Sequence, residues 1–248
     1  MSMNIRGFTF DDKLKKSFYY RSPLLMKVIK DAEPDIIGFQ EMGPFEYDFF
    51  SSHMSGYTFI QGYATKGGGG VVTAIRTDRF EIVDTGKFWL SETPEVQSGS
   101  WGTACIRVAL YANIIDKKTN TSYTITNTHL DHVSEEARIK GMALILNRME
   151  ALNTSKMIIF GDMNDFVFGE MYESVMDFGL NDAQLVATDK HLGPGATYHS
   201  YGRILNNARI DFFFLTPNII VNSYEVIDKT FDGAYYSDHF SILMKISE

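Results

Sequence analysis

The sequence predicts a layered α/β or α+β fold, in which β-sheets pack together and helices cover the outside. Two observations predict it: short apolar runs of strand length recur along the chain, and amphipathic helical patterns lie between some of them. The 248 residues are 44% hydrophobic and 22% charged, which is ordinary for a globular protein. Because β-rich layered folds often use this length for a single core, we expect one domain over residues 1–248.

The predicted strands rest on alternation and on β-branched residues. Residues 122–128 alternate as a half-buried strand does, and residues 1–7 are typical of the end of a strand. With the alternating strand counted from residue 123, the predicted strands after the first are residues 35–40, 70–76, 81–88, 105–115, 123–128, 157–161, 210–215, 219–227 and 241–246.

The predicted helices begin at capping residues. Apolar side chains recur at helical spacing over residues 23–30, after Ser22, and over residues 134–152, after Ser134 with acidic residues in the first turn. Residues 45–54 are a third candidate. The glycine run 67–70 is not followed by Gly-Lys-Ser/Thr, so we interpret it as a turn between two strands and not as a phosphate loop.

The charge and hydropathy of the chain limit which binding partners we expect. The formal net charge is −8, and the basic residues are scattered apart from Lys13, Lys15 and Lys16, which we interpret as solvated surface. Proteins that hold long nucleic acids through their phosphates usually carry a basic face, so we expect a small or short substrate. No apolar run approaches the roughly 20 residues that span a bilayer. We expect a monomer without a membrane anchor in the cytoplasm, with an upstream leader as the alternative.

The single cysteine cannot form an internal disulfide. Cys105 begins an apolar stretch that ends at Leu110, so we expect an inert thiol in the core.

Polar residues recur at the edges of the predicted strands, and Asp211 lies inside an apolar run, where a carboxylate needs a partner. Side chains at strand edges can converge on one end of a sandwich. The short blocks that carry them are Gln40-Glu41, Asn127-Thr128-His129, Gly161-Asp162-Met163-Asn164, Arg209-Ile210-Asp211 and Ser237-Asp238-His239.

In this order, and with Asn4 near the start, these blocks resemble the endonuclease/exonuclease/phosphatase (pancreatic-deoxyribonuclease-like) superfamily. The resemblance extends from Asn4 to His239. Residues 88–94 and 128–132 further resemble a bacterial branch near the deadenylase-like members. The resemblance implies a four-layer sandwich of two stacked mixed β-sheets flanked by helices.

The resemblance also implies a metal site. Glu41 would be the principal ligand of Mg²⁺ or Mn²⁺, with Asn4 and Asp238 nearby, and these oxygen donors suit a hard octahedral cation. Superfamily nucleases often carry an acidic residue where Arg6 stands, so we expect one ion, with two as the alternative.

The resemblance further implies catalytic roles. Asp162 and Asn164 would orient the attacking water and bind the phosphate, and His239 would pair with Asp211. His129 would donate to a phosphate oxygen. In-line attack on a phosphate ester needs a group that takes the proton of the water. The base is either Asp162 or the His239–Asp211 pair; we favour Asp162 orienting the water, with His239 protonated.

Further residues are candidates for substrate contacts, and each has a structural alternative. Arg107 would bind phosphate bidentately or form a surface ion pair. Trp89 is a stacking platform or a core aromatic, and Asp131 and His132 contact substrate or support residues that do. Arg76 is a fourth candidate contact. His191 and His199 have no evident partner, so we interpret them as surface or loop residues.

Two other functions compete. His129-x-Asp131-His132 resembles part of the metallo-β-lactamase zinc signature, but Asn127 stands at the first histidine position. The other rival is a non-catalytic binding module that retains the fold. Within the favoured class we expect a phosphodiesterase or phosphatase. Its candidate substrates are short RNA or DNA ends, a phosphoinositide-like or sphingomyelin-like headgroup, or a nucleotide-derived small molecule.

Overall fold

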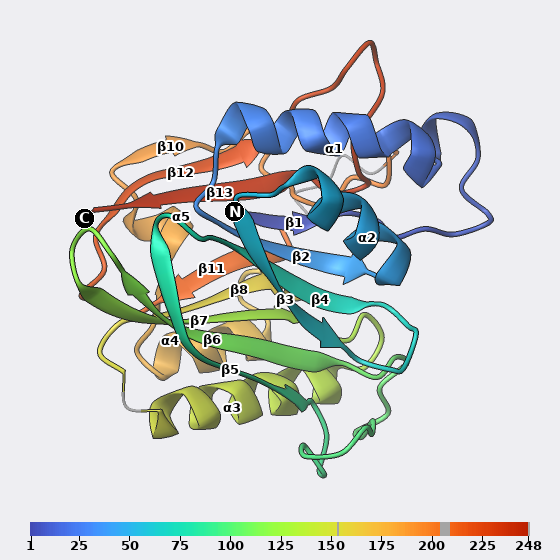
Figure 1. Ribbon diagram of the computed structural model, residues 1–248. Coiled ribbons are helices and arrows are strands. Elements are labelled where there is room, and N and C mark those ends of the chain that lie inside the picture. The colour runs from blue at the N-terminus through green and yellow to red at the C-terminus, as the bar shows by residue number, and fades with distance from the viewer. Residues whose placement is uncertain (153, 204–208, 248) are drawn as a thin grey trace.

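The computed structural model describes residues 1–152, 154–203 and 209–247. Two mixed β-sheets stack face to face in it, and helices cover their outer faces (Figure 1). This is the four-layer sandwich that the sequence predicted.

The first sheet has seven strands in the order β10-β12-β13-β1-β2-β4-β3. Its central strands β1 and β2 run parallel, and the other pairs are antiparallel except β10 with β12. The bounds are β1 Ser2–Asn4, β2 Ile36–Met42, β3 Tyr57–Tyr63, β4 Gly70–Arg76, β10 Asp189–His191, β12 Val221–Ile227 and β13 Ser241–Ile246.

The second sheet has six strands in the order β5-β6-β7-β8-β11-β9, with β7 and β8 parallel. The bounds are β5 Phe80–Trp89, β6 Val108–Asp116, β7 Thr121–His129, β8 Met157–Asp162, β9 Asn181–Asp182 and β11 Asp211–Leu215. Every predicted strand is present. β6 begins later than expected, because residues 105–107 belong to the preceding loop.

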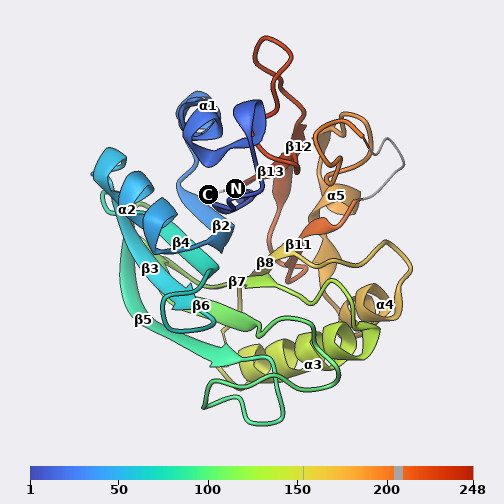
Figure 2. The same ribbon diagram turned by 90° about the vertical axis from the view of Figure 1, so that its right-hand side faces the viewer.

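Helices α1 (Phe18–Ala32) and α2 (Pro44–His53) cover the seven-stranded sheet, and α3 (Glu135–Ala151) and α4 (Glu170–Asp177) cover the six-stranded sheet (Figures 1 and 2). The short elements η1 (Leu14–Lys16) and α5 (Ala183–Val186) complete the described part of the chain. The Ser134 hydroxyl caps α3 by accepting from Ala137 N–H at 3.2 Å. No helix in this part combines the length and apolarity needed to cross a bilayer.

Helix α1 begins at Phe18, five residues before the predicted start at Pro23. The earlier start places Arg21 in the helix, fully buried. Its guanidinium donates to the carbonyl oxygens of Ile5 at 2.5 Å, Lys16 at 2.7 Å and Tyr236 at 3.3 Å, and also to that of Arg6. These bonds hold the segment that follows β1.

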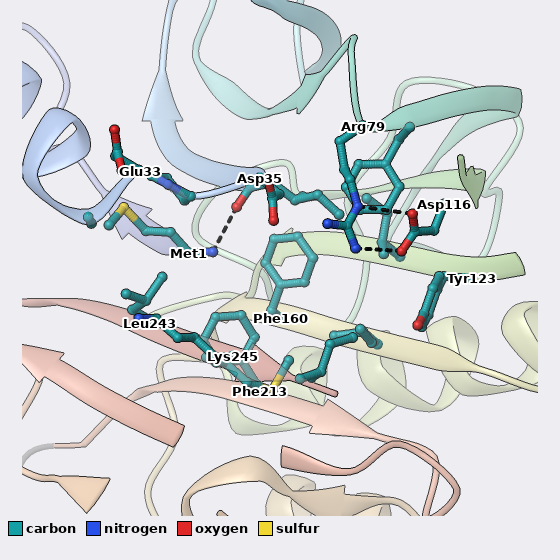
Figure 3. Close-up of a pocket in the computed structure, with 18 of the residues that line it drawn as sticks. Met1, Glu33, Asp35, Arg79, Asp116, Tyr123, Phe160, Phe213, Leu243 and Lys245 are labelled. Carbon is teal, nitrogen blue, oxygen red and sulfur yellow. Dashed lines mark hydrogen bonds and ion pairs between the residues drawn. The ribbon is translucent and has the colours of Figure 1, made fainter. Parts of the chain in front are cut away.

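A cavity of about 320 Å³ lies between the sheets at the end where β2 begins. Its lining includes Ile36, Tyr123, Phe160 and Phe213, with a bidentate pair between Arg79 and Asp116 at one side (Figure 3). The polar blocks of the sequence lie at the opposite end, so this cavity is not where their chemistry takes place.

We predict that Arg21→Met lowers the free energy of unfolding by about 2–4 kcal/mol, because buried carbonyl oxygens lose their donors. Urea denaturation followed by circular dichroism measures the change. Lys30→Met, an exposed position on the same helix, is the control and stays within about 0.5 kcal/mol of the wild type. Equal stability of the two variants would contradict the role given to Arg21.

Candidate active site

The polar blocks meet at one end of the sandwich because of strand direction and register. In the six-stranded sheet His129 lies beside Asp162, and Asp162 lies beside Asp211. In the other sheet Asn4 lies beside Gln40, next to Glu41. Strand β2 runs toward the right of Figure 1, so Figure 2 looks onto this end.

The side chain of Asn4 joins the two sheets at this point. Its amide nitrogen donates to Glu41 Oε1 at 3.2 Å, from the first sheet, and to Asp162 Oδ2 at 3.0 Å, from the second. Its oxygen accepts from Arg6 N–H at 3.0 Å. Glu41 and Asp162 are therefore held on either side of one buried amide.

Glu41 occupies an irregular position at the end of β2. The register shifts between Gln40 and Met42, and Glu41 takes a left-handed backbone conformation with φ 61°. Gly7 passes so close that a Cβ there would lie 2.3 Å from the Glu41 carbonyl oxygen, and its N–H donates to Glu41 Oε2 at 3.3 Å. The bulge directs a half-exposed carboxylate toward Asn4.

Asp162, Asp211 and His239 form a buried cluster whose potential ligand atoms lie within 4.8 Å of one another. His239 Nδ1 lies 2.9 Å from Asp211 Oδ2, and His239 Nε2 lies 3.6 Å from Asp162 Oδ2. Burial, and then the charge of Asp211, raise the pKa of Asp162 to about 7. Burial alone would lower the pKa of His239, but the carboxylates of Asp211 and Asp162 raise it well above its ordinary value.

His129 completes the cluster from β7, with Nε2 3.4 Å from Asp162 Oδ2. Burial, followed by the positive charges of Arg107 and His239, lowers the pKa of His129 well below its ordinary value. The two histidines beside Asp162 therefore favour different protonation states, with His239 charged and His129 neutral.

Asn164 and Asp238 flank the cluster. Asn164, with φ 49°, donates its backbone N–H to Asp162 Oδ1 at 3.0 Å and its amide to the Leu130 carbonyl oxygen at 3.0 Å. Asp238 is buried, and its carboxylate lies 3.3 Å from the Ser237 hydroxyl and 4.0 Å from Arg6 Nε. The structure thus brings every predicted metal-binding and catalytic residue to this end of the sandwich.

Two residues of the predicted blocks lie beneath the site and not in it. Gln40 Nε2 donates to Asn127 Oδ1 at 2.8 Å, across the interface between the sheets. The Asn127 amide donates in turn to the carbonyl oxygens of Phe39 and Val72, both at 3.1 Å. This buried amide pair connects the sheets directly below the candidate site.

The expected substrate contacts fall into two groups. Arg107 lies near the cluster, with Nη2 3.4 Å from His132 Nδ1 and no carboxylate within ion-pair distance among the described residues. Asp131 is buried, and both of its oxygens accept hydrogen bonds from neighbouring loops. Asp131 is therefore placed to support the loop that carries Arg107.

The other two expected contacts, Arg76 and Trp89, differ in where they lie. Arg76 ends β4 beside the beginning of β2, at the far end from Glu41, and it pairs with Asp78 at 2.8 Å. Because β4 runs antiparallel to β2, Arg76 lies away from the candidate site, and the substrate contact expected of it stays a prediction. Trp89 donates from Nε1 to the Ala64 carbonyl oxygen at 2.7 Å and packs in a small apolar cluster. This placement agrees with the alternative of a core aromatic.

One sequence interpretation, the thiol in the core, is wrong. Cys105 is exposed and not in the core, because β6 begins three residues after it. His199 lies in a loop as expected but is buried, with its ring 4.0 Å from that of Phe240. His191 is exposed and has a partner, Asp228, at 3.2 Å.

Some residues that position the site had no sequence signal. Thr197 accepts from the N–H groups of Ile210 at 3.0 Å and Asp211 at 3.1 Å, which fixes the start of β11. Asp12 pairs with Arg6 Nε at 3.1 Å. Both lie in loops, Thr197 13 and 14 residues from its partners and Asp12 six residues from Arg6, and loops carry no periodic pattern that predicts such contacts.

The donor set at Glu41 fits a hard divalent cation. Its carboxylate accepts only from neutral N–H groups, those of Asn4 and Gly7, and forms no ion pair among the described residues. Carboxylate and amide oxygens are the ligands that Mg²⁺ and Mn²⁺ prefer. The cluster of Asp162, Asp211 and His239 also has metal-ligand spacing, but its imidazole nitrogen is already hydrogen bonded to Asp211.

The chain matches the model of the endonuclease/exonuclease/phosphatase family over residues 1–239, and it belongs to that family. Members of the family are hydrolases of phosphate esters. Membership of this family excludes the zinc hydrolase of metallo-β-lactamase type, and His132 lies exposed beside Arg107.

Solved structures resemble this one over nearly all of its length. An endonuclease/exonuclease/phosphatase from Bacteroides vulgatus is 30% identical, with a TM-score of 0.94 over 99% of this chain and 97% of that one. A mannosyl-6-phosphatase from Bacteroides thetaiotaomicron is 26% identical, with a TM-score of 0.93 over 100% of this chain and 98% of that one.

One relative is known from its sequence: an uncharacterised protein of Acanthamoeba polyphaga mimivirus is 27% identical over 66% of each chain.

We predict that Asp131→Asn destabilises the protein in a pH-dependent way. Burial alone would raise the pKa of Asp131, but hydrogen bonds, first that from Ser134 N–H, lower it to about 2. A carboxyl whose folded pKa lies below its unfolded value stabilises the fold above about pH 4 and loses this effect as the pH falls toward 2. The expected loss is about 2 kcal/mol at pH 7, measured by urea denaturation.

The difference between wild type and Asp131→Asn should shrink between pH 4 and pH 2, where the wild-type carboxyl becomes protonated. Asp177→Asn, an exposed carboxylate on α4, serves as the control and stays within about 0.5 kcal/mol at both ends of the range. A difference that is constant with pH would refute this account of Asp131.

Proposed function

We propose that the protein is a phosphoesterase that depends on Mg²⁺ or Mn²⁺ and hydrolyses a small phosphate ester by in-line attack of water. The observation that carries the proposal is the buried cluster of Asp162, Asp211 and His239, tied through Asn4 to the half-exposed carboxylate of Glu41. Family membership supports hydrolysis of a phosphate ester.

Glu41 would be the principal ligand of the ion, with the Asn4 oxygen and Asp238 nearby. The bound ion would neutralise charge on the phosphate and on the departing oxygen. Arg6, paired with Asp12 and 4.0 Å from Asp238, already supplies a positive charge on that side. This supports one ion in preference to two.

Asp162 would orient the attacking water. Its Oδ1 is held by Asn164 N–H and its Oδ2 by the Asn4 amide, so the carboxylate has a defined direction. His239, between Asp162 and Asp211, would carry its proton and stabilise the negative charge that develops on the phosphate. Asp211 fixes which ring nitrogen of His239 faces the site, through the contact at 2.9 Å.

His129, Asn164 and Arg107 would bind the phosphate oxygens. His129 is neutral and offers a single ring N–H, and Arg107 offers a guanidinium without a carboxylate partner in the described residues. Two observations support a small ester as the substrate: the similarity to a mannosyl-6-phosphatase and the net charge of −8, which is unfavourable for binding long nucleic acids. A monomeric state, a single domain, a cytoplasmic location and the branch near the deadenylase-like members stay predictions.

We predict hydrolysis of phosphate esters with Mg²⁺ or Mn²⁺ and its loss when the ion is chelated. A panel of phosphomonoesters and phosphodiesters, followed by phosphate or alcohol release, measures it. Glu41→Ala and His239→Ala should each lower turnover by at least about 100-fold. Both variants should remain folded, because these residues serve the site more than the core.

Glu81→Ala, an exposed carboxylate on β5, is the matched control and should keep the wild-type rate. Full rates in both site variants would reject the assigned roles. Absence of activity with any ester and either ion would favour the non-catalytic binding module.

A further inference from the structure

A pocket of about 420 Å³ adjoins the candidate site on one side only. Three segments form its walls: residues 6–9 after β1, residues 69–71 at the start of β4, and residues 105–108 before and at the start of β6. Glu41 and His129 form its inner end, whereas Asp162, Asp211 and His239 do not line it.

This position determines which part of a substrate the pocket can receive. The Asn4 amide separates Asp162, on the side of the attacking water, from Glu41, on the side of the pocket. In-line displacement places the departing oxygen opposite the attacking water. We infer that the pocket binds the alcohol portion of the ester and selects an alcohol of one ring, the size of a monosaccharide, over a nucleic-acid strand. This inference rests on the proposed function.

One wall is a fixed aromatic face. Phe8 N–H donates to the carboxylate of Glu46, which also caps α2 through Gly43 N–H at 3.0 Å. The Phe8 ring contacts Phe45 at 5.6 Å and Tyr19 at 6.1 Å between centroids, both edge to face. The ring is thus held in place before a ligand arrives.

The facing wall has no side chains where the glycine run begins β4. Gly69 lines the pocket, and a Cβ on it would meet nothing closer than Met42 O at 3.7 Å, so a Cβ fits there without a clash. A Cβ on Gly70 would lie 2.3 Å from Gly62 O, which the hairpin does not allow. The free volume of the pocket therefore depends on Gly69.

The lining favours a compact ring. Val71, Ile106 and Val108 give the pocket apolar walls. Its charged groups, Glu41, Arg6 and Arg107, lie on the segments that also border the candidate site. A volume of this size suits a small molecule. The pocket thus discriminates by size and shape.

Gly69→Leu tests the inference by filling the pocket. Three esters are assayed. Mannose 6-phosphate has a ring-sized alcohol, glycerol 3-phosphate leaves the pocket mostly empty, and the third is a short oligonucleotide. The wild type should prefer mannose 6-phosphate to both others by about tenfold in kcat/KM. Gly69→Leu should lower kcat/KM for mannose 6-phosphate by about tenfold and change that for glycerol 3-phosphate by less than about twofold.

Gly56→Leu is the matched control. Gly56 lies in the turn before β3, and a Cβ there meets nothing within 4 Å, so this variant adds the same side chain away from the pocket. Its preference among the esters should equal that of the wild type. An unchanged preference in Gly69→Leu, or an equal loss for both monoesters, would overturn the inference.

The only cysteine offers a second test without a new side chain. Cys105 is exposed and lines the pocket, so a thiol reagent modifies one defined position. A bulky maleimide should lower hydrolysis of mannose 6-phosphate by at least about tenfold, and a methylthio group by less than about twofold, each relative to the unlabelled protein. Cys105→Ser, treated with the same maleimide and compared with its own untreated form, should not respond.

The experiments distinguish failure of the pocket assignment from failure of the proposed phosphoesterase activity. Hydrolysis that depends on Mg²⁺ but is equally fast for all three esters, and indifferent to Gly69→Leu and to the maleimide, would remove the pocket assignment and leave the phosphoesterase. Absence of hydrolysis of every ester by the wild type would remove the phosphoesterase itself.

Discussion

The site depends on one buried amide that joins the two sheets. Asn4 donates to carboxylates from both, Glu41 and Asp162, and so sets the separation of the groups at the mouth of the sandwich. Below it, the pair of Gln40 and Asn127 repeats the connection with neutral groups. Amides suit these positions because they offer donors without adding a charge that the interior would have to compensate.

Three residues with left-handed backbone and a buried group of charged side chains lie at this same end of the sandwich. Arg6, Glu41 and Asn164 adopt left-handed conformations, with φ of 50°, 61° and 49°. Such conformations cost roughly 1–3 kcal/mol for residues other than glycine, and they tend to occur at functional sites. Asp162 and Asp211 are buried side by side with His239. Together these features indicate a region arranged for chemistry more than for stability.

Regular elements were predictable where the local pattern and the burial agree. β4 and β13 begin and end at the predicted residues, because apolar runs there coincide with buried strands. β3 and α4 were missed: β3 is an edge strand whose side chains are mostly half-buried, and a predicted helix requires a longer pattern than the eight residues of α4. α1 starts early because Arg21 finds its acceptors in other segments.

The sequence by itself determined the family, the layered fold and the residues that gather at one end, because these rest on ordered short blocks and on periodicity. Tertiary structure alone decided that Arg76 lies far from Glu41, that Cys105 is exposed, and that Phe8 and Gly69 face one pocket. The physical reason is that strand direction and loop paths, which bring residues distant in sequence together, leave no periodic signal in the chain.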